Sequence, residues 1–135
     1  MMISGKIKAT VWFASDCDDT ALTVKVSEER ADGSTWNIRT GIATLAFRDD
    51  KLGPRGKYSP GEVVEVEVEM LPIVWELQPG SRIRIDISSS DFPQYSIHSN
   101  YAGPWADQTR TRIAHQSVYS GKKYPSRIEL PLLKE

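Results

Sequence analysis

The residues best suited to chemistry in this chain are two histidines, several serines and aspartates, and one cysteine. A Ser-His-Asp triad would have to use His98 or His115, because these are the only histidines. No Gly-x-Ser-x-Gly nucleophile elbow occurs in the sequence. Cys17 has no second cysteine for a disulfide or a zinc site, so we expect a small, partly buried side chain there. We therefore predict no catalytic residue, and an enzyme acting through Cys17 or a histidine is the least favoured hypothesis.

An acidic cluster is the nearest candidate for a metal site. Asp16, Asp18 and Asp19 offer closely spaced carboxylate oxygens, which are ligands that Ca²⁺ prefers. The spacing departs from an EF-hand loop, which needs a Gly at the sixth position and a Glu at the twelfth. Carboxylates at the end of a strand also cap turns through nearby backbone N–H groups. Capping is the favoured interpretation, the three aspartates are weak metal candidates, and we expect no cofactor.

Aromatic residues form the third candidate site, which would bind a ligand or a protein partner. Residues 91–111 form a long, aromatic and otherwise polar segment, which in a compact domain is typical of a functional or packed loop. Aromatic rings stack on apolar sugar faces, and they also fill cores and anchor protein interfaces. Phe92 and Pro93 are alternatively core residues, because they end the strongest predicted strand. The candidate interface or ligand patch comprises Phe92, Tyr95, Tyr101, Trp105 and Trp75.

Strands must position these residues, because apolar and polar residues alternate with a period of two. Alternation is clear over 7–13, 22–26, 64–70 and 83–87, and weaker over 35–39, 42–48, 112–119 and 127–132. In the run at 64–70 the glutamates predict a solvated strand face that discourages edge pairing. Trp12 falls on the face opposite Val11 and Phe13, so either it is exposed or that sheet is covered on both sides.

Turn residues separate these runs. Asp32-Gly33 predicts a hairpin, and Pro60-Gly61 and Pro79-Gly80 each precede a strand. Residues 49–60 have the composition of a mobile connection. Eight or nine short strands predict an all-β fold, a single antiparallel β-sandwich or jelly roll over residues 1–135.

Composition narrows the class of protein. The chain has 135 residues, 39% of them hydrophobic and 26% charged, as in a folded globular domain. A net charge of −1 gives no reason to expect nucleic acid or an anionic membrane as a partner. No run approaches the roughly 20 apolar residues that cross a bilayer. No secretory signal follows Met1, so we expect a cytoplasmic location if residue 1 is the natural start.

Six ordered blocks between about residues 7 and 133 carry a family resemblance. They are Ala-Thr-Val-Trp-Phe-Ala-Ser-Asp-Cys-Asp-Asp-Thr at 9–20, Asp-Gly at 32–33 followed by Gly41, Tyr-Ser-Pro-Gly-Glu at 58–62, Gly-Ser-Arg-Ile-Arg-Ile-Asp-Ile-Ser-Ser-Ser-Asp-Phe-Pro at 80–93, Asn-Tyr-Ala-Gly at 100–103, and Tyr-Pro-Ser-Arg-Ile-Glu-Leu-Pro at 124–131. Together they resemble the C-terminal β-domain of the X-prolyl dipeptidyl peptidase and cocaine-esterase family of serine hydrolases. Ala21, Tyr101 and Ala102 depart from that pattern.

The resemblance implies a galactose-binding-like jelly roll packed against an α/β-hydrolase catalytic domain or subunit. In that family the triad lies in the catalytic domain, and the β-domain supports it, edges the substrate cleft and takes part in dimer contacts. We therefore expect a non-catalytic accessory domain of a dipeptidyl-peptidase or esterase. A homodimer would cover the aromatic patch if no partner does. The alternative is a stand-alone module that binds carbohydrate or another small ligand.

Overall fold

The computed structural model describes residues 1–48 and 56–133 of the chain. Within these residues the regular structure is strand, apart from two single turns of 3-10 helix, as the all-β prediction requires. No helix of the described residues is long and apolar enough to cross a membrane. Residues 49–55 of the predicted connection at 49–60 lie outside the described residues. The elements are β1 (Met2–Gly5), β2 (Lys8–Ser15), β3 (Ala21–Glu29), β4 (Thr35–Thr44), η1 (Leu45–Phe47), β5 (Val64–Glu69), β6 (Ile73–Glu76), β7 (Arg82–Ser88), η2 (Trp105–Asp107), β8 (Gln116–Tyr119) and β9 (Arg127–Glu129).

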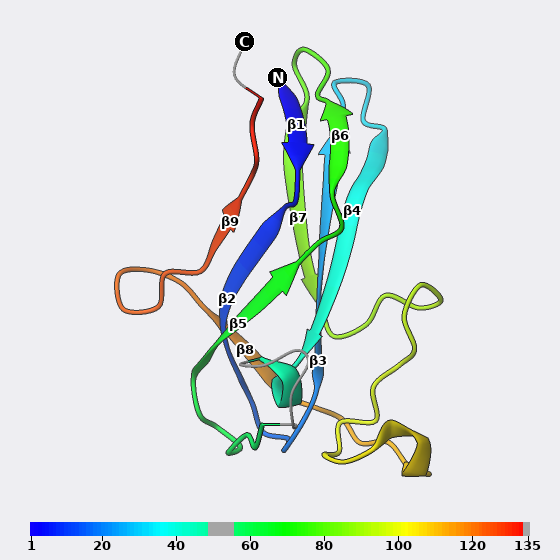
Figure 1. Cartoon of the computed structure of the whole chain (residues 1–135), viewed down its shortest axis with the longest axis vertical. Helices are drawn as coiled ribbons and strands as arrows, with labels where there is room; N and C mark the ends of the chain where they lie inside the picture. The colour runs from blue at the N-terminus through cyan, green and yellow to red at the C-terminus, as the bar shows by residue number, and fades with distance from the viewer. Residues whose placement is uncertain (49–55, 134–135) are drawn as a thin grey trace.

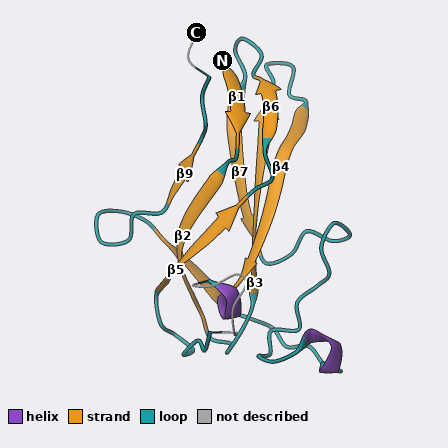
Figure 2. Cartoon of the chain, viewed as in Figure 1, coloured by secondary structure: helices purple, strands orange, loops and turns teal. Residues whose placement is uncertain are grey.

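The strands form antiparallel sheets that run along the long axis of the molecule (Figure 1). One sheet has the order β5-β2-β8, with β9 also paired to β2, and a second has the order β4-β3-β7. β1 and β6 form a separate pair. A long segment between β7 and β8 projects from one end as loop with the single turn η2 (Figure 2).

The two larger sheets bury a common core. Alternation places Val11 and Phe13 of β2 on one side of it and Val24 and Val26 of β3 on the other. Each of these side chains is at most 3% exposed. The polar residues that alternate with Val66 on β5 face outward, where Lys8 pairs with Glu67 at 2.6 Å. The predicted solvated acidic face of β5 is therefore confirmed.

The outer face of β2 is covered as well. The ring of Trp12 lies 5.4 Å from the ring of Tyr124, and that ring lies 5.2 Å from the ring of Tyr119. The backbone N–H of Trp12 donates to Ser126 Oγ at 2.8 Å. Of the two alternatives for Trp12, the sheet covered on both sides is the one observed.

The core is open along the edge formed by β7 and β8. Ile85 and Ile87 lie directly opposite the buried Val26 and Val24, so they point toward the interior, yet they are 37% and 42% exposed. Val118 of β8 lies opposite Phe13 of β2 and is 49% exposed. The described part of the chain therefore leaves apolar, inward-pointing side chains accessible at this edge.

Candidate functional site

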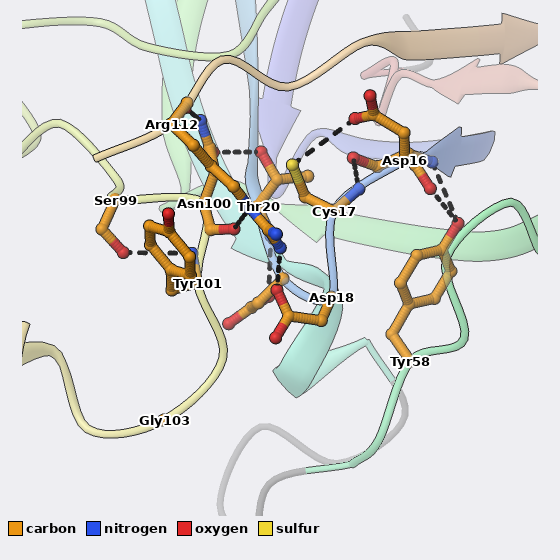
Figure 3. A network of polar contacts seen from close by, with 12 residues as sticks. Asp16, Cys17, Asp18, Thr20, Tyr58, Ser99, Asn100, Tyr101, Gly103 and Arg112 are labelled. Carbon is orange, nitrogen blue, oxygen red and sulfur yellow. Dashed lines mark hydrogen bonds and ion pairs between the residues drawn. The ribbon is translucent and has the colours of Figure 1, made fainter. Parts of the chain in front are cut away.

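Asp16, Cys17, Asp18 and Tyr101 lie at the corner that follows β2, where the long loop returns to the sheets (Figure 3). Asp19 is 3% exposed and lies at the centre of this corner. Its Oδ1 accepts the backbone N–H groups of Thr20 at 2.9 Å and of Ala46 at 3.0 Å. Its Oδ2 lies 3.5 Å from Nε2 of His98. Asp19 thus ties the corner to η1 and to the long loop.

Asp16 bonds to the segment that enters β8. Its Oδ1 accepts the backbone N–H of His115 at 2.8 Å, and its Oδ2 lies 2.8 Å from Nδ1 of the same residue. The backbone bond, followed by the ring contact, lowers the pKa of Asp16 from 3.8 to about 2. Asp16 therefore stays ionised in the folded chain over all but the most acidic conditions.

Asp18 has a different partner from Asp16 and Asp19, because it forms an ion pair with Arg112. The three carboxylates of Asp16, Asp18 and Asp19 thus have separate partners. Within residues 1–48 and 56–133, no group of three or more His, Cys, Asp or Glu side chains could hold a metal ion. The contacts of Asp16 and Asp19 with backbone N–H groups are those of the capping interpretation.

Neither histidine is arranged as a catalytic base. His98 accepts the backbone N–H of Asn100 at its Nδ1, at 2.9 Å, and faces Asp19 with its other nitrogen. His115 pairs with Asp16 on the surface. Both histidines therefore lie beside a carboxylate, but among the hydrogen bonds of the described residues no serine or threonine hydroxyl meets either ring. A base and an orienting group without a nucleophile do not make a triad.

Cys17 is not placed to react either. It is 1% exposed, and burial, followed by the neighbouring Asp16 carboxylate, raises the pKa of its thiol. The thiolate is the reactive form, so these surroundings suppress its reactivity. Cys17 is therefore a small buried residue, buried more completely than the partly buried side chain that was predicted.

A second set of bonds joins the corner to the loop. Thr20 Oγ1 donates to Asn100 Oδ1 at 2.7 Å, and Asn100 Nδ2 donates to the carbonyl of Arg112 at 2.7 Å (Figure 3). Asn100 has a φ of 66°, a left-handed conformation that asparagine tolerates better than most residues. Gln116 donates to the same threonine hydroxyl at 2.7 Å. Asn100, Arg112 and Gln116 were not candidates, because their bonds to Thr20 and Asp18 cross 80 or more residues of sequence and leave no local pattern.

The candidate patch does not form one surface. Phe92 and Trp105 are 70% and 56% exposed, so Phe92 is not a core residue. Tyr95 is half-buried and donates from its hydroxyl to the carbonyl of Thr40 at 3.2 Å. Tyr101 is also half-buried, with the guanidinium groups of two arginines 4.4 Å and 4.6 Å from its ring centre. Trp75 lies elsewhere, on β6 at the end of the molecule that holds the N-terminus (Figure 1).

The contacts of Trp75 are those of a residue that stabilises the fold. Its ring packs against the hydrophobic core, and its indole N–H donates to Oε2 of the fully buried Glu28 at 3.2 Å. Of the five residues of the candidate patch, Phe92 and Trp105 remain exposed, and Tyr95 lines the same pocket as Trp105.

Tyr95 and Trp105 help to line a pocket of about 310 Å³ between the long loop and the end of β4. Phe47 adds a third aromatic side chain, and His98 and Asp19 supply polar groups. Thr44 also lines the pocket, and its buried hydroxyl has no hydrogen-bond partner in the described residues. The pocket combines apolar walls with a few polar groups, as small-molecule sites do.

Comparison with known proteins matches the chain to one domain of larger enzymes. Residues 1–129 match the model of the X-Pro dipeptidyl-peptidase C-terminal non-catalytic domain. Cocaine esterase of Rhodococcus sp. (strain MB1 Bresler) is 31% identical over 134 residues, which are 98% of this chain and 23% of that protein.

Solved structures share the fold. An aminopeptidase from a marine sediment Thaumarchaeota archaeon matches with a TM-score of 0.86 and 21% identity, over 98% of this chain and 24% of that one. A CocE/NonD family hydrolase from Staphylococcus aureus matches with a TM-score of 0.72 and 20% identity, over 98% of this chain and 28% of that one. This chain spans about a quarter of the length of these relatives, in which the domain is part of a larger hydrolase chain. The chain belongs to the family of the X-Pro dipeptidyl-peptidase C-terminal non-catalytic domain, the β-domain of the CocE/NonD and X-Pro dipeptidyl-peptidase hydrolases.

Proposed function

We propose that this chain acts as the accessory β-domain of an α/β-hydrolase of the dipeptidyl-peptidase or esterase type. The observation that carries the proposal is the match of residues 1–129 to a non-catalytic domain of such enzymes. The geometry of the corner agrees with it, because the rings of His98 and His115 have carboxylate partners and, among the hydrogen bonds of the described residues, no serine or threonine hydroxyl meets either ring. The chain then supports the catalytic domain and the edge of its substrate cleft and takes no part in bond cleavage.

The proposal includes a galactose-binding-like jelly roll. Support comes from the way that the chain alternates between the two larger sheets. β2 lies in one sheet, β3 and β4 lie in the other, β5 returns to the first, β7 lies in the second, and β8 and β9 return again. Such crossings between antiparallel sheets are typical of jelly rolls.

The proposed contact with the catalytic domain or subunit is the exposed part of the long loop. Phe92 and Trp105 are large, accessible and aromatic, and such residues contribute most to protein interfaces. The network around Asn100 and Asp19 fixes the base of this loop, so little ordering entropy is lost on binding.

The test is a binding measurement between this chain and an α/β-hydrolase that bears Gly-x-Ser-x-Gly, from the same organism. The chain alone is expected to show no esterase or prolyl-dipeptidase turnover. Trp105→Ser should weaken binding to the hydrolase at least about tenfold, which is the loss of one interface anchor. Trp36→Ser is the matched control, because Trp36 is similarly exposed, at 49%, but lies on β4 outside the loop.

Two results would overturn the proposal. One is turnover by the chain alone that follows it through purification and disappears when a single Ser or His is replaced. The other is a hydrolase that neither binds the chain nor changes its activity when the chain is present.

A second candidate function is a stand-alone module for a small ligand, and the pocket beside Trp105 favours it. The polar groups of His98, Asp19 and Thr44 stand among three aromatic rings. A neutral sugar ring suits such a site, since it offers an apolar face for stacking and hydroxyls for the polar groups. Calorimetric titration with a panel of monosaccharides tests this function: binding that is lost in Trp105→Ala and kept in Trp36→Ala supports it, and no heat with any sugar rejects it.

A further inference from the structure

The pocket beside Trp105 combines a carboxylate with aromatic walls. Of the described residues that line it, Asp19 is the only acid, and none is a lysine or an arginine. The side chains of Phe47, Tyr95 and Trp105 share the walls with it. The face of an aromatic ring is also negative, because of the quadrupole of its π electrons. A carboxylate beside several such rings favours a cation as ligand.

His98, which also lines the pocket, does not cancel the charge of Asp19. Its Nδ1 accepts the backbone N–H of Asn100 at 2.9 Å, so that nitrogen carries no proton. The one ring proton is then on Nε2, which lies 3.5 Å from Oδ2 of Asp19. The ring is neutral in this arrangement, and Asp19 alone sets the charge of the described lining.

The groups of the pocket are held in place without a ligand. Oδ1 of Asp19 accepts the backbone N–H of Ala46 at 3.0 Å, so the carboxylate is tied to the turn that carries Phe47. The hydroxyl of Tyr95 donates to the carbonyl of Thr40 at 3.2 Å, which fixes the far end of that ring. A site whose groups are already ordered loses less entropy on binding.

The lining favours a methylated cation over an ammonium group with N–H donors. A primary ammonium is strongly hydrated, so it binds poorly outside water unless each of its three donors finds an acceptor. Oδ1 of Asp19 already accepts two backbone N–H groups, and Oδ2 faces His98. A quaternary ammonium has no N–H to satisfy, and its methyl groups contact aromatic faces favourably.

We propose that this pocket binds a small quaternary ammonium compound, with its methyl groups against Tyr95 and Trp105 and its charge compensated by Asp19. The pocket volume of about 310 Å³ is at the lower end of the roughly 300–1,000 Å³ of small-molecule sites, so it suits a compact cation. This ligand rests on the pocket of the second candidate function, and its positive charge distinguishes it from the neutral sugar considered there. The accessory role requires no ligand in this pocket.

Titration of the chain with choline tests the proposal, followed by the indole N–H signals of the four tryptophans in nuclear magnetic resonance spectra. The signal of Trp105 should shift and saturate. The signal of Trp36 should stay unchanged, because the guanidinium of Arg30 already lies 4.7 Å from the centre of that ring. The matched probe is the tert-butyl analogue of choline, in which a carbon atom replaces the nitrogen. It has the same shape and no charge, so it should bind at least about threefold more weakly.

Variants of the chain separate the ring from the charge. Trp105→Leu keeps an apolar side chain and removes the aromatic face, so it should weaken choline binding at least about threefold, and Trp36→Leu is the control that should leave it unchanged. Asp19→Asn removes the charge and keeps an oxygen for the backbone N–H groups, so choline and its tert-butyl analogue should then bind alike. If circular dichroism shows that Asp19→Asn does not fold, the comparison of the two ligands in the unchanged chain still decides.

Equal affinity of the unchanged chain for choline and its tert-butyl analogue would overturn the proposal. So would a shift of the Trp105 signal that never saturates, choline binding that is unchanged in Trp105→Leu, or binding of a neutral monosaccharide in this pocket without binding of choline. No hydrolase takes part in these titrations, so their failure leaves the accessory role standing, and failure to bind a hydrolase leaves the result for choline standing.

Discussion

At the scale of single residues, the buried carboxylate of Glu28 is a clear case of a charge held by specific partners. It is 0% exposed; Oε1 accepts the backbone N–H of Gln78 at 2.7 Å, and Oε2 accepts the indole N–H of Trp75. Burial alone would raise the pKa of Glu28, but the hydrogen bonds and the nearby Arg30 outweigh it, and the pKa is lowered. These partners therefore offset the cost of burying the charge; Trp75 and Gln78 come from one segment, and Arg30 follows Glu28 by two residues.

Glu28→Gln should destabilise the fold by about 1.5–3 kcal/mol, because the amide can accept at only one of the two oxygen positions and leaves a buried donor unpaired. Urea unfolding gives the difference in free energy. Glu29→Gln is the matched control, because Glu29 pairs with the exposed Arg82 on the surface, and such a pair contributes less than about 1 kcal/mol. Equal losses in the two variants would contradict the role assigned to Glu28.

A second single residue, Asp16, makes the stability of the fold depend on pH. Its pKa falls from 3.8 to about 2 on folding, so the folded chain binds this proton less tightly than the unfolded chain does. The stability that Asp16 contributes is thus present above pH 3.8 and lost as the pH falls toward about 2. Asp16→Asn should flatten the decline of the unfolding midpoint in that window, as measured by thermal denaturation in a series of buffers.

His115→Ala separates the two causes of this shift. It removes the ring contact and keeps the backbone N–H of residue 115, which is the larger cause. Titration by nuclear magnetic resonance should therefore find the Asp16 pKa still well below 3.8 in this variant. A return to 3.8 would show that the ring, and not the backbone, carries the effect.

At the scale of elements, Gly41 lets β4 approach β5 closely. A Cβ at this position would lie 2.7 Å from Cγ1 of Val68 and 3.0 Å from Cγ of Met70. Gly41→Ala should therefore cost about 1–3 kcal/mol, as overpacking of a tight core does. The cost should fall in the Val68→Ala background, because the closest atom is gone, and a double-mutant cycle by urea unfolding measures this coupling. Additive effects would contradict the close approach.

The alternation in the sequence predicted the strands whose two faces differ most. β2, β3, β5 and β7 have apolar residues at every second position, and each was expected. The predicted runs at 35–39 and 42–48 are instead one strand, β4, followed by a single 3-10 turn, because Gly41 continues the strand where a break was expected. β1 and β6 were not expected, because four residues are too few for a periodic pattern.

Hydrogen bonds between residues distant in sequence determine features that the alternation of apolar and polar residues does not predict. The run at 112–119 is strand only from residue 116, since the backbone N–H of Arg112 donates to Ser99 and that of His115 donates to Asp16. The pocket beside Trp105 joins segments about 60 residues apart, so Tyr95 and Trp105 were candidates, whereas Phe47 and the shape of the pocket were not foreseen. Trp75, also a member of the candidate patch, packs against the core and bonds to Glu28, and this contact has no trace in the local sequence.

At the scale of the whole molecule, the first strand, β1, and the segment that follows the last strand, β9, close the fold together. The backbone N–H of Ser4 donates to the carbonyl of Pro131 at 2.8 Å, and that of Leu133 donates to the carbonyl of Met2 at 3.0 Å. Between them Ile3, which is fully buried, forms an isolated bridge with Leu132. The segment that follows β9 is therefore part of the cover over the core, although it is hardly strand itself.

Removal of residues 131–135 should destabilise the fold by about 2–3 kcal/mol, because it uncovers much of Ile3 and breaks the two backbone hydrogen bonds. Removal of residues 134–135 alone is the control, since it leaves Pro131, Leu132 and Leu133 in place, and it should cost much less. Urea unfolding of the three chains measures both differences. If the two truncations cost the same, Ile3 is held by β6 alone, and the closure of the fold by its two ends contributes nothing to its stability.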